Sequence, residues 1–251
     1  MQRLTLRYLS DIHLEFHAKK DIPTILSKIK PDLSPTTVCI CAGDISNPYD
    51  ESYDMFMQHM SRSFAKTFVI AGNHEYYNKT KLVGETDTYL ANYFKKFKNI
   101  SYLNNQSEQY LGRWFIGTTL WSKITNPAFE INDVHYIPKF DYLQYNRLNM
   151  MAVDFLETEL ETKENCVVIT HHIPSSDFID PKYKTAKMRP YNQWFASDLQ
   201  HLFRPNIKAW IYGHTHSPNI THTNGIQFAC NPIGYPRERY NIDYNIEIEI
   251  D

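Results

Sequence analysis

Hydrophobic residues recur along the chain as short apolar runs that are separated by longer segments of mixed character. The runs have the length and the β-branched or aromatic content that are typical of strands. They cover residues 3–9, 36–42, 67–72, 113–118, 165–170, 208–213 and 226–230. The runs at 36–42 and 165–170 are apolar at successive positions, which predicts strands that are covered on both faces.

Between several of these runs, apolar residues recur at helical spacing instead. The pattern predicts helices over residues 22–30, 49–64, 82–97 and 147–160. Strands that alternate with helices favour βαβ units and a parallel-rich sheet, whereas the short gaps between the later strands favour antiparallel pairing. Since no repeat or linker interrupts the pattern, we expect residues 1–251 to form a single α/β domain.

Two long segments, residues 121–145 and 175–197, follow neither pattern. The first is rich in aromatic side chains and contains two prolines, and the second combines prolines with several basic side chains. Loops of this length inside a compact domain usually carry function. We therefore expect both segments to be ordered and to form the rim of a substrate site.

Composition excludes several classes of partner. The 251 residues are 42% hydrophobic, and the formal net charge is −2 with a pI near 6.6. The lack of a basic excess argues against stable binding to nucleic acid or to an anionic membrane. No apolar run resembles a signal peptide or a membrane span. The cysteines lie in or beside apolar runs, which predicts buried thiols in a reducing compartment, so we expect a cytoplasmic protein.

Metal-ligand residue types follow five of the predicted strands at their carboxyl ends, where open α/β sheets bind ligands. The motifs are Asp11-x-His13, Gly43-Asp44, Gly72-Asn73-His74-Glu75, His171-His172 and Gly213-His214-x-His216. A spacing of two places both side chains of a pair on one face of an extended backbone. Each of the three glycines stands directly before a ligand, where the backbone must turn or come close to a crowded centre.

These motifs offer seven oxygen and nitrogen donors and no sulfur, a set that suits Mn, Fe, Zn or Ni. Seven donors exceed the needs of one four-coordinate ion but serve two ions if one carboxylate bridges them. Two divalent ions with only two carboxylates leave a positive site that would attract a phosphate. The sequence leaves open whether His171 or His172 is the ligand, because one of them could be a core residue. The other histidines, His17, His59, His135, His201 and His222, have no matching spacing and receive no role.

The ordered motif series resembles that of the calcineurin-like metallophosphoesterases, and it spans residues 11 to 216. The resemblance implies a four-layer α/β/β/α sandwich of two mixed sheets flanked by helices. It implies two divalent metal ions, manganese among the candidates, and a nucleophilic hydroxide that bridges them. By motif position, Asp11, His13, Asp44 and His216 would bind one ion. Asp44, Asn73, His171 and His214 would bind the other, and His74 would contact the phosphate and help to protonate the leaving group.

A later stretch, Cys230 to Tyr235, resembles the asparagine-proline-glycine turn that often follows the last histidine motif in this family, and it implies a structural role near the metal-bearing loop. Arg237 and Arg239 follow, and either a substrate contact or a solvated pair is compatible with their position. The arginines that Ser/Thr protein phosphatases of this superfamily usually carry after Gly-Asp and Gly-Asn-His-Glu are replaced here by Ile45-Ser46-Asn47-Pro48 and Tyr76-Tyr77-Asn78.

The expected activity is therefore hydrolysis of a phosphomonoester or phosphodiester of a nucleotide or another small phosphate. Aromatic residues could stack a base, and the candidates are Tyr76, Trp121, Tyr136, Tyr142 and Trp194. Alternatives are a phosphoprotein phosphatase, a single-strand nuclease with a basic groove at residues 182–189, and a non-catalytic protein-binding scaffold. The complete ligand series argues against the scaffold.

Overall fold

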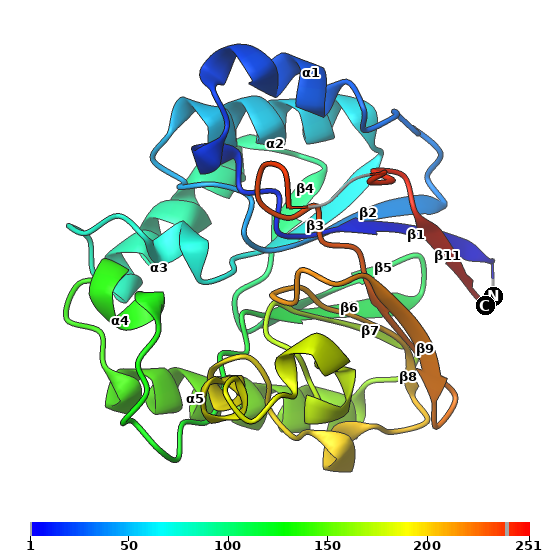
Figure 1. Ribbon diagram of the computed structural model, residues 1–251. Coiled ribbons are helices and arrows are strands. Elements are labelled where there is room, and N and C mark those ends of the chain that lie inside the picture. Colours follow the sequence, from blue (N-terminus) through cyan, green and yellow to red (C-terminus); the bar gives the residue numbers. More distant parts are fainter. Residues whose placement is uncertain (1, 239–240) are drawn as a thin grey trace.

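A computed structural model describes residues 2–238 and 241–251, and it contains two β-sheets that lie face to face (Figure 1). The first sheet has the order β11-β1-β2-β3-β4, in which β1 to β4 are parallel and β11 is antiparallel to β1. Its strands are β1 (Leu4–Leu9), β2 (Thr37–Ala42), β3 (Lys66–Ile70), β4 (Ile100–Tyr102) and β11 (Glu247–Ile250).

The second sheet has the order β5-β6-β7-β8-β10-β9. Its four central strands are parallel, and the edge strands β5 and β9 pair antiparallel with their neighbours. The strands are β5 (Gln106–Tyr110), β6 (Arg113–Thr118), β7 (Cys166–Thr170), β8 (Ile207–Ile211), β10 (Ile226–Cys230) and β9 (Asn219–Thr223). The two sheets are thus both mixed, as expected.

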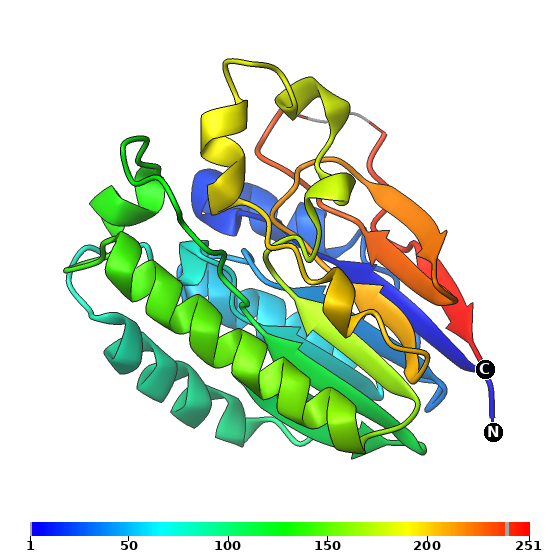
Figure 2. The same cartoon turned by 90° about the horizontal axis from the view of Figure 1, so that it is seen from below.

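Helices cover the outer face of each sheet and complete four layers (Figures 1 and 2). The α-helices are α1 (Ile22–Leu26), α2 (Glu51–Ser63), α3 (Val83–Tyr93), α4 (Asn132–Tyr136) and α5 (Tyr142–Thr162). Short 3-10 helices are η1 (Leu14–Phe16), η2 (Lys19–Asp21), η3 (His74–Tyr76), η4 (Phe94–Lys96), η5 (Ser176–Phe178), η6 (Pro181–Tyr183), η7 (Arg189–Trp194) and η8 (Gln200–Leu202). Helices α1, α2 and α3 share a hydrophobic core with the first sheet, and α5 shares one with the second.

A third apolar core lies between the sheets. It joins residues such as Leu6, Ile40 and Phe68 of the first sheet to Phe115 and Val167 of the second. Every residue of β2, β3 and β7 is buried, which confirms the prediction that the continuously apolar strands are covered on both faces. The four cysteines are buried thiols, as predicted.

Several element boundaries differ from the predictions. The predicted helix at 147–160 begins earlier, at Tyr142, where Asp141 accepts a hydrogen bond from Gln144 N and caps it. The predicted helix at 22–30 ends already at Leu26. The sequence did not predict strands β4, β5, β9 and β11. All four lie at a sheet edge, and each is short or partly polar, so its apolar pattern is weak.

The two segments outside the regular pattern are ordered. Residues 121–145 contain α4 and lead into α5, and residues 175–197 fold into a series of 3-10 turns. Their tryptophans, Trp121 and Trp194, are buried, as is Tyr76. These three side chains are therefore part of the core, and the idea that they stack a base is wrong. Among the described residues, we find no helix with the length and apolar character needed to cross a bilayer.

Candidate metal centre

The predicted donors meet at the carboxyl edge of the parallel strands, where the two sheets face each other. Asp11 and His13 follow β1, Asp44 follows β2, and Asn73 follows β3. His171 follows β7, and His214 and His216 follow β8. Asp11, His13, Asp44, Asn73 and His171 are buried, whereas His214 and His216 are partly exposed. The sheet edge thus gathers seven side chains that are widely separated in sequence.

The backbone at this edge is not extended, contrary to the sequence interpretation. Strand β1 ends at Leu9, and both Asp11 (φ 52°) and His13 (φ 50°) adopt the left-handed conformation. Asp44 (φ 55°) and His214 (φ 66°) do the same. Non-glycine residues rarely adopt this conformation, and when they do, they cluster at functional sites. The side chains of Asp11 and His13 therefore converge through tight turns and not through strand alternation.

The first cluster consists of Asp11, His13 and His216. His13 Nε2 lies 3.2 Å from His216 Nε2, and His216 Nε2 lies 3.6 Å from Asp11 Oδ1. His13 Nδ1 is 3.1 Å from a carboxylate oxygen of Glu15, and His216 Nδ1 is 2.6 Å from one of Glu238. A carboxylate accepts hydrogen bonds, so each imidazole carries its proton on Nδ1 and a lone pair on Nε2.

The two facing Nε2 atoms cannot form a hydrogen bond with each other, because both offer lone pairs. A cation between them would satisfy both nitrogens and the nearby Asp11 carboxylate. A metal-bound imidazole whose other nitrogen donates to a carboxylate is a common arrangement in metalloproteins. The residues of the first cluster therefore fit a divalent metal ion.

The second cluster consists of Asp44, Asn73, His171 and His214. His171 Nδ1 donates a hydrogen bond to the Ala42 carbonyl at 2.8 Å, which leaves Nε2 as the nitrogen that could bind an ion. That Nε2 faces Asn73 Oδ1 at 3.0 Å, Asp44 Oδ2 at 3.3 Å and His214 Nδ1 at 3.2 Å. Several acceptors thus converge here too, and this cluster also fits a cation.

Asp44 lies between the two clusters. Its Oδ2 is 3.3 Å from His171 Nε2 and 3.8 Å from His13 Nε2, while its Oδ1 accepts a hydrogen bond from His74 N at 2.8 Å. Burial would raise the pKa of Asp44, but the nearby His171 and His74 outweigh it and hold that pKa well below its usual value. Asp44 is therefore an anion that both clusters share.

His171 and His172 have different surroundings. The ring of His172 is buried between the Tyr145 hydroxyl, 2.7 Å from Nε2, and the Thr119 carbonyl, 3.1 Å from Nδ1. Burial, together with the neighbouring His171, lowers the pKa of His172 to about 3. His172 is thus a neutral core residue with both nitrogens engaged, and only His171 faces Asp44 and Asn73.

Close packing explains all three glycines that precede ligands, and a Cβ atom on Gly213 would lie 2.9 Å from the Ala42 carbonyl oxygen. A Cβ atom on Gly72 would lie 2.2 Å from Asp44 Oδ1, and one on Gly43 would lie 2.5 Å from Gly72 N. Gly43 also has a φ of +86°, which favours glycine. The buried Glu75 carboxylate accepts hydrogen bonds from the backbone N–H groups of Asp44, Ile45 and Gly72, and so ties the two glycine turns together.

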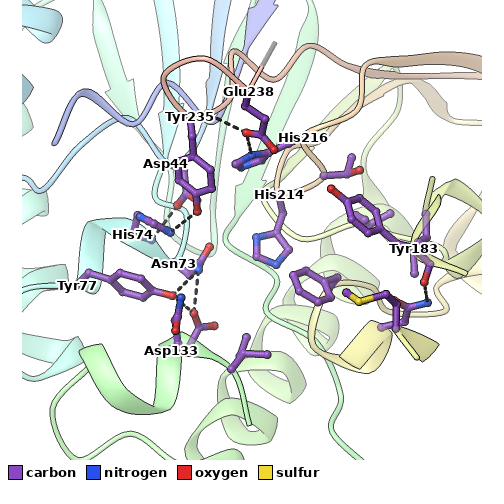
Figure 3. A pocket seen from close by; sticks show the side chains of 18 residues that line it. Asp44, Asn73, His74, Tyr77, Asp133, Tyr183, His214, His216, Tyr235 and Glu238 are labelled. Atoms are coloured by element: carbon purple, nitrogen blue, oxygen red, sulfur yellow. Dashed lines mark hydrogen bonds and ion pairs between the residues drawn. The ribbon is translucent and has the colours of Figure 1, made fainter. Parts of the chain in front are cut away.

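Besides Glu238, which holds His216, two other carboxylates that the sequence interpretation missed hold candidate ligands in place. Glu15 Oε1 lies 3.1 Å from His13 Nδ1 and 2.9 Å from His74 Nδ1. Asp133, in α4, accepts a hydrogen bond from Asn73 Nδ2 at 2.9 Å and another from the Tyr77 hydroxyl (Figure 3). This contact turns the amide oxygen of Asn73 toward His171. Glu15 lies two residues after His13, as His13 lies two residues after Asp11, so the sequence pattern could have identified it. No sequence pattern marks Asp133.

His74 lies beside the clusters and lines the cavity above them, with its Nδ1 on Glu15. Burial would lower the pKa of His74, but the carboxylates of Asp44 and Glu15 outweigh it and raise the pKa to about 9. Tyr235, at the end of the asparagine-proline turn, packs against the rings of His13 and His216 at centroid distances of 4.4 Å and 4.6 Å.

The stretch from Cys230 to Tyr235 contacts the first motif directly. Gly234 N donates to the Asp11 carbonyl at 2.8 Å, and Ile233 N donates to the Ser10 carbonyl at 2.9 Å. The turn therefore supports the loop that carries Asp11. Arg237 is exposed and does not line the cavity, and Arg239 lies outside the described residues.

Comparison with known proteins agrees with this geometry. The family model described as calcineurin-like phosphoesterase matches residues 5–218. An uncharacterised protein of Acanthamoeba polyphaga mimivirus is 34% identical over 273 residues, which covers 98% of this chain and 96% of the viral protein.

Two solved structures share the fold at low identity. A phosphopantetheinyl hydrolase from Mycobacterium tuberculosis matches with a TM-score of 0.74 at 17% identity, covering 98% of this chain and 96% of its own. A putative 5'-nucleotidase from Staphylococcus aureus matches with a TM-score of 0.52 at 13% identity, covering 93% of this chain and 49% of its own. The family match, the sheet arrangement and the candidate ligand clusters support a metal-dependent phosphoesterase. The chain belongs to the calcineurin-like phosphoesterase family.

Proposed function

We propose that the protein hydrolyses small phosphate esters with the help of two divalent metal ions. The observation that carries the proposal is the position of Asp44 Oδ2, 3.3 Å from His171 Nε2 in one cluster and 3.8 Å from His13 Nε2 in the other. One carboxylate oxygen within reach of both clusters is what a bridging ligand requires. Two ions held this way would supply an activated water and neutralise the charge of a phosphate during in-line displacement.

The ligand roles follow from the two clusters. Asp11, His13, Asp44 and His216 would hold one ion, and Asp44, Asn73, His171 and His214 would hold the other. Glu15, Glu238 and Asp133 would keep His13, His216 and Asn73 in the orientation that presents their lone pairs to the ions.

His74 would act on the leaving group. Its Nδ1 is held by Glu15, so the ring presents Nε2 toward the cavity, where the Tyr235 hydroxyl is 3.4 Å away. The Glu15 carboxylate on Nδ1 stabilises the protonated form of the ring. A protonated imidazole in this place can donate its Nε2 proton to the oxygen of the departing alcohol.

The first test is turnover of p-nitrophenyl phosphate and bis-p-nitrophenyl phosphate by protein loaded in turn with Mn, Ni, Zn and Mg. We expect hydrolysis of at least one of them with at least one metal. Lack of turnover of both substrates under all four conditions would favour the non-catalytic scaffold instead.

Two variants separate the proposed roles. His74→Ala should reduce turnover of an alkyl phosphate by about 10²- to 10⁴-fold, as expected for loss of a general acid, with the metal content nearly unchanged. Asp44→Asn should lower the occupancy of both ions together. If Asp44→Asn keeps one ion at full occupancy, Asp44 does not bridge.

A further inference from the structure

The cavity above the clusters has two chemically different ends. It has a volume of about 410 Å³, within the range of small-molecule sites. Candidate ligands such as Asp44, His214 and His216 form one end. The rest of the lining is mainly aromatic and aliphatic, with Tyr77, Ile131, Ile179, Tyr183, Met188 and Phe195, and it also contains uncharged polar side chains, namely Asn132, Asn192 and Thr215. Most of this wall comes from residues 121–145 and 175–197, the segments expected to form the rim.

Lysine and arginine are missing from this lining, as far as the described residues extend. Two further carboxylates line the cavity, and both have partners in the protein. Asp133 accepts from Asn73 and Tyr77, and Glu238 faces His216 Nδ1 and accepts from Tyr235 N. Outside the metal end, which the candidate ligands and His74 form, the charges that the described residues place on this wall are therefore negative.

The basic residues at 182–189 do not bring positive charge to this cavity. Lys184 and Arg189 line a second cavity between this segment and α5, and they do not line the cavity above the clusters. Lys184 Nζ donates to the Asp177 carbonyl at 3.2 Å, and Lys182 pairs with Asp180 at 3.7 Å. None of the cations of the expected basic groove at residues 182–189 thus lines the cavity at the candidate metal centre.

These charges restrict the substrate. Among the described residues, a phosphate group finds compensating charge only at the metal end, and a second anion on the esterified group would leave water for a wall of apolar, uncharged polar and carboxylate groups. We propose that the site takes phosphate esters whose only anionic group is the phosphate itself, with an uncharged or cationic organic part. This inference rests on the proposed function for the location of the phosphate.

Three alkyl phosphates of similar size test the inference because they differ mainly in end-group charge. Propyl phosphate is neutral at its end, 2-aminoethyl phosphate is cationic, and phosphoglycolate is anionic. Calorimetric titration into the metal-loaded protein should give a dissociation constant for phosphoglycolate at least about tenfold higher than for the other two, as like charges within one low-dielectric cavity repel. Equal or tighter binding of phosphoglycolate would overturn the inference.

A matched pair of variants assigns the effect to the cavity. Met188→Lys places a cation in the wall and should remove most of the discrimination against phosphoglycolate. Ala186→Lys adds the same charge to the same segment at an exposed position outside the lining, and should leave the discrimination unchanged. An equal effect of both variants would mean that general surface charge, and not the cavity wall, sets the preference.

Because binding is measured directly, the inference and the proposed function can fail separately. Loss of p-nitrophenyl phosphate turnover with the binding preference intact would refute only the hydrolase. Turnover with no preference among the three phosphates would refute only the substrate class.

Discussion

Replacing Gly72 with alanine should displace the shared carboxylate while changing little else. The φ of Gly72 lies outside the left-handed region, so the backbone itself accepts an alanine. The added Cβ, however, would lie 2.2 Å from Asp44 Oδ1 and 2.7 Å from His171 Cε1. The difference between 2.2 Å and the 3.4 Å at which ordinary contacts begin is 1.2 Å, so Asp44 or the turn must move by about this amount.

A shift of this size is large for a metal ligand. Misplacement by about 1 Å can cost about 10²-fold in rate, and disturbing the support of a ligand typically costs about 10- to 100-fold in metal affinity. Overpacking a buried site costs about 1–3 kcal/mol of folding free energy. For a chain of this length, that corresponds to a fall in Tm of roughly 2–12 °C.

The assay combines metal analysis of dialysed protein, calorimetric metal titration and thermal unfolding in chelator. The control is Gly84→Ala in α3, where a Cβ would meet no atom within 4 Å. This control should bind metal normally and should be neutral or stabilised by up to about 1 kcal/mol, since alanine is a better helix former. Wild-type metal affinity in Gly72→Ala would refute the view that this glycine exists to admit the Asp44 carboxylate.

Three further predictions concern the supporting residues and the ions. Glu15 also holds His13, so Glu15→Ala is assayed with metal in excess. Under that condition it should slow hydrolysis of alkyl phosphates by about 10²-fold but that of p-nitrophenyl phosphate much less, because p-nitrophenolate leaves without a proton. Adding Glu15→Ala to His74→Ala should slow alkyl phosphates little further if the two residues act together, and full additivity would contradict this. Asp133→Ala should weaken metal binding by about 10- to 100-fold, because it frees the Asn73 amide. Tyr77→Phe is the control, since it keeps the hydrogen bond between Asp133 and Asn73. Equal metal affinities of the two variants in calorimetry would show that Asp133 does not position Asn73. When free metal is present at 100 times its dissociation constant, adding a chelator should lower the free energy of unfolding by about 2.7 kcal/mol. The Tm should then fall by roughly 5–11 °C, and an unchanged Tm would argue against a resident ion.

Local sequence determined which residues stand at the ends of the strands. Apolar runs such as the one around Val38 fix buried strands, and parallel strands bring their carboxyl ends to one edge. The donors Asp44, Asn73 and His214 could therefore be predicted to meet from their positions after such runs. The same reasoning failed for the short and polar edge strands, whose pairing depends on neighbours distant in sequence.

Tertiary structure alone decided how the donors are oriented. The choice between His171 and His172 depends on Tyr145 and Thr119, which the second sheet and α5 bring to His172. The contact between Asp133 and Asn73 joins residues 60 positions apart and leaves no local pattern. The turns at Asp11 and His13 are left-handed because long-range contacts over-determine them, among them the hydrogen bonds from His13 N to the Asp44 carbonyl and from Gly234 N to the Asp11 carbonyl. The sequence thus determined which donors are present, and packing between distant segments determined where each lone pair points.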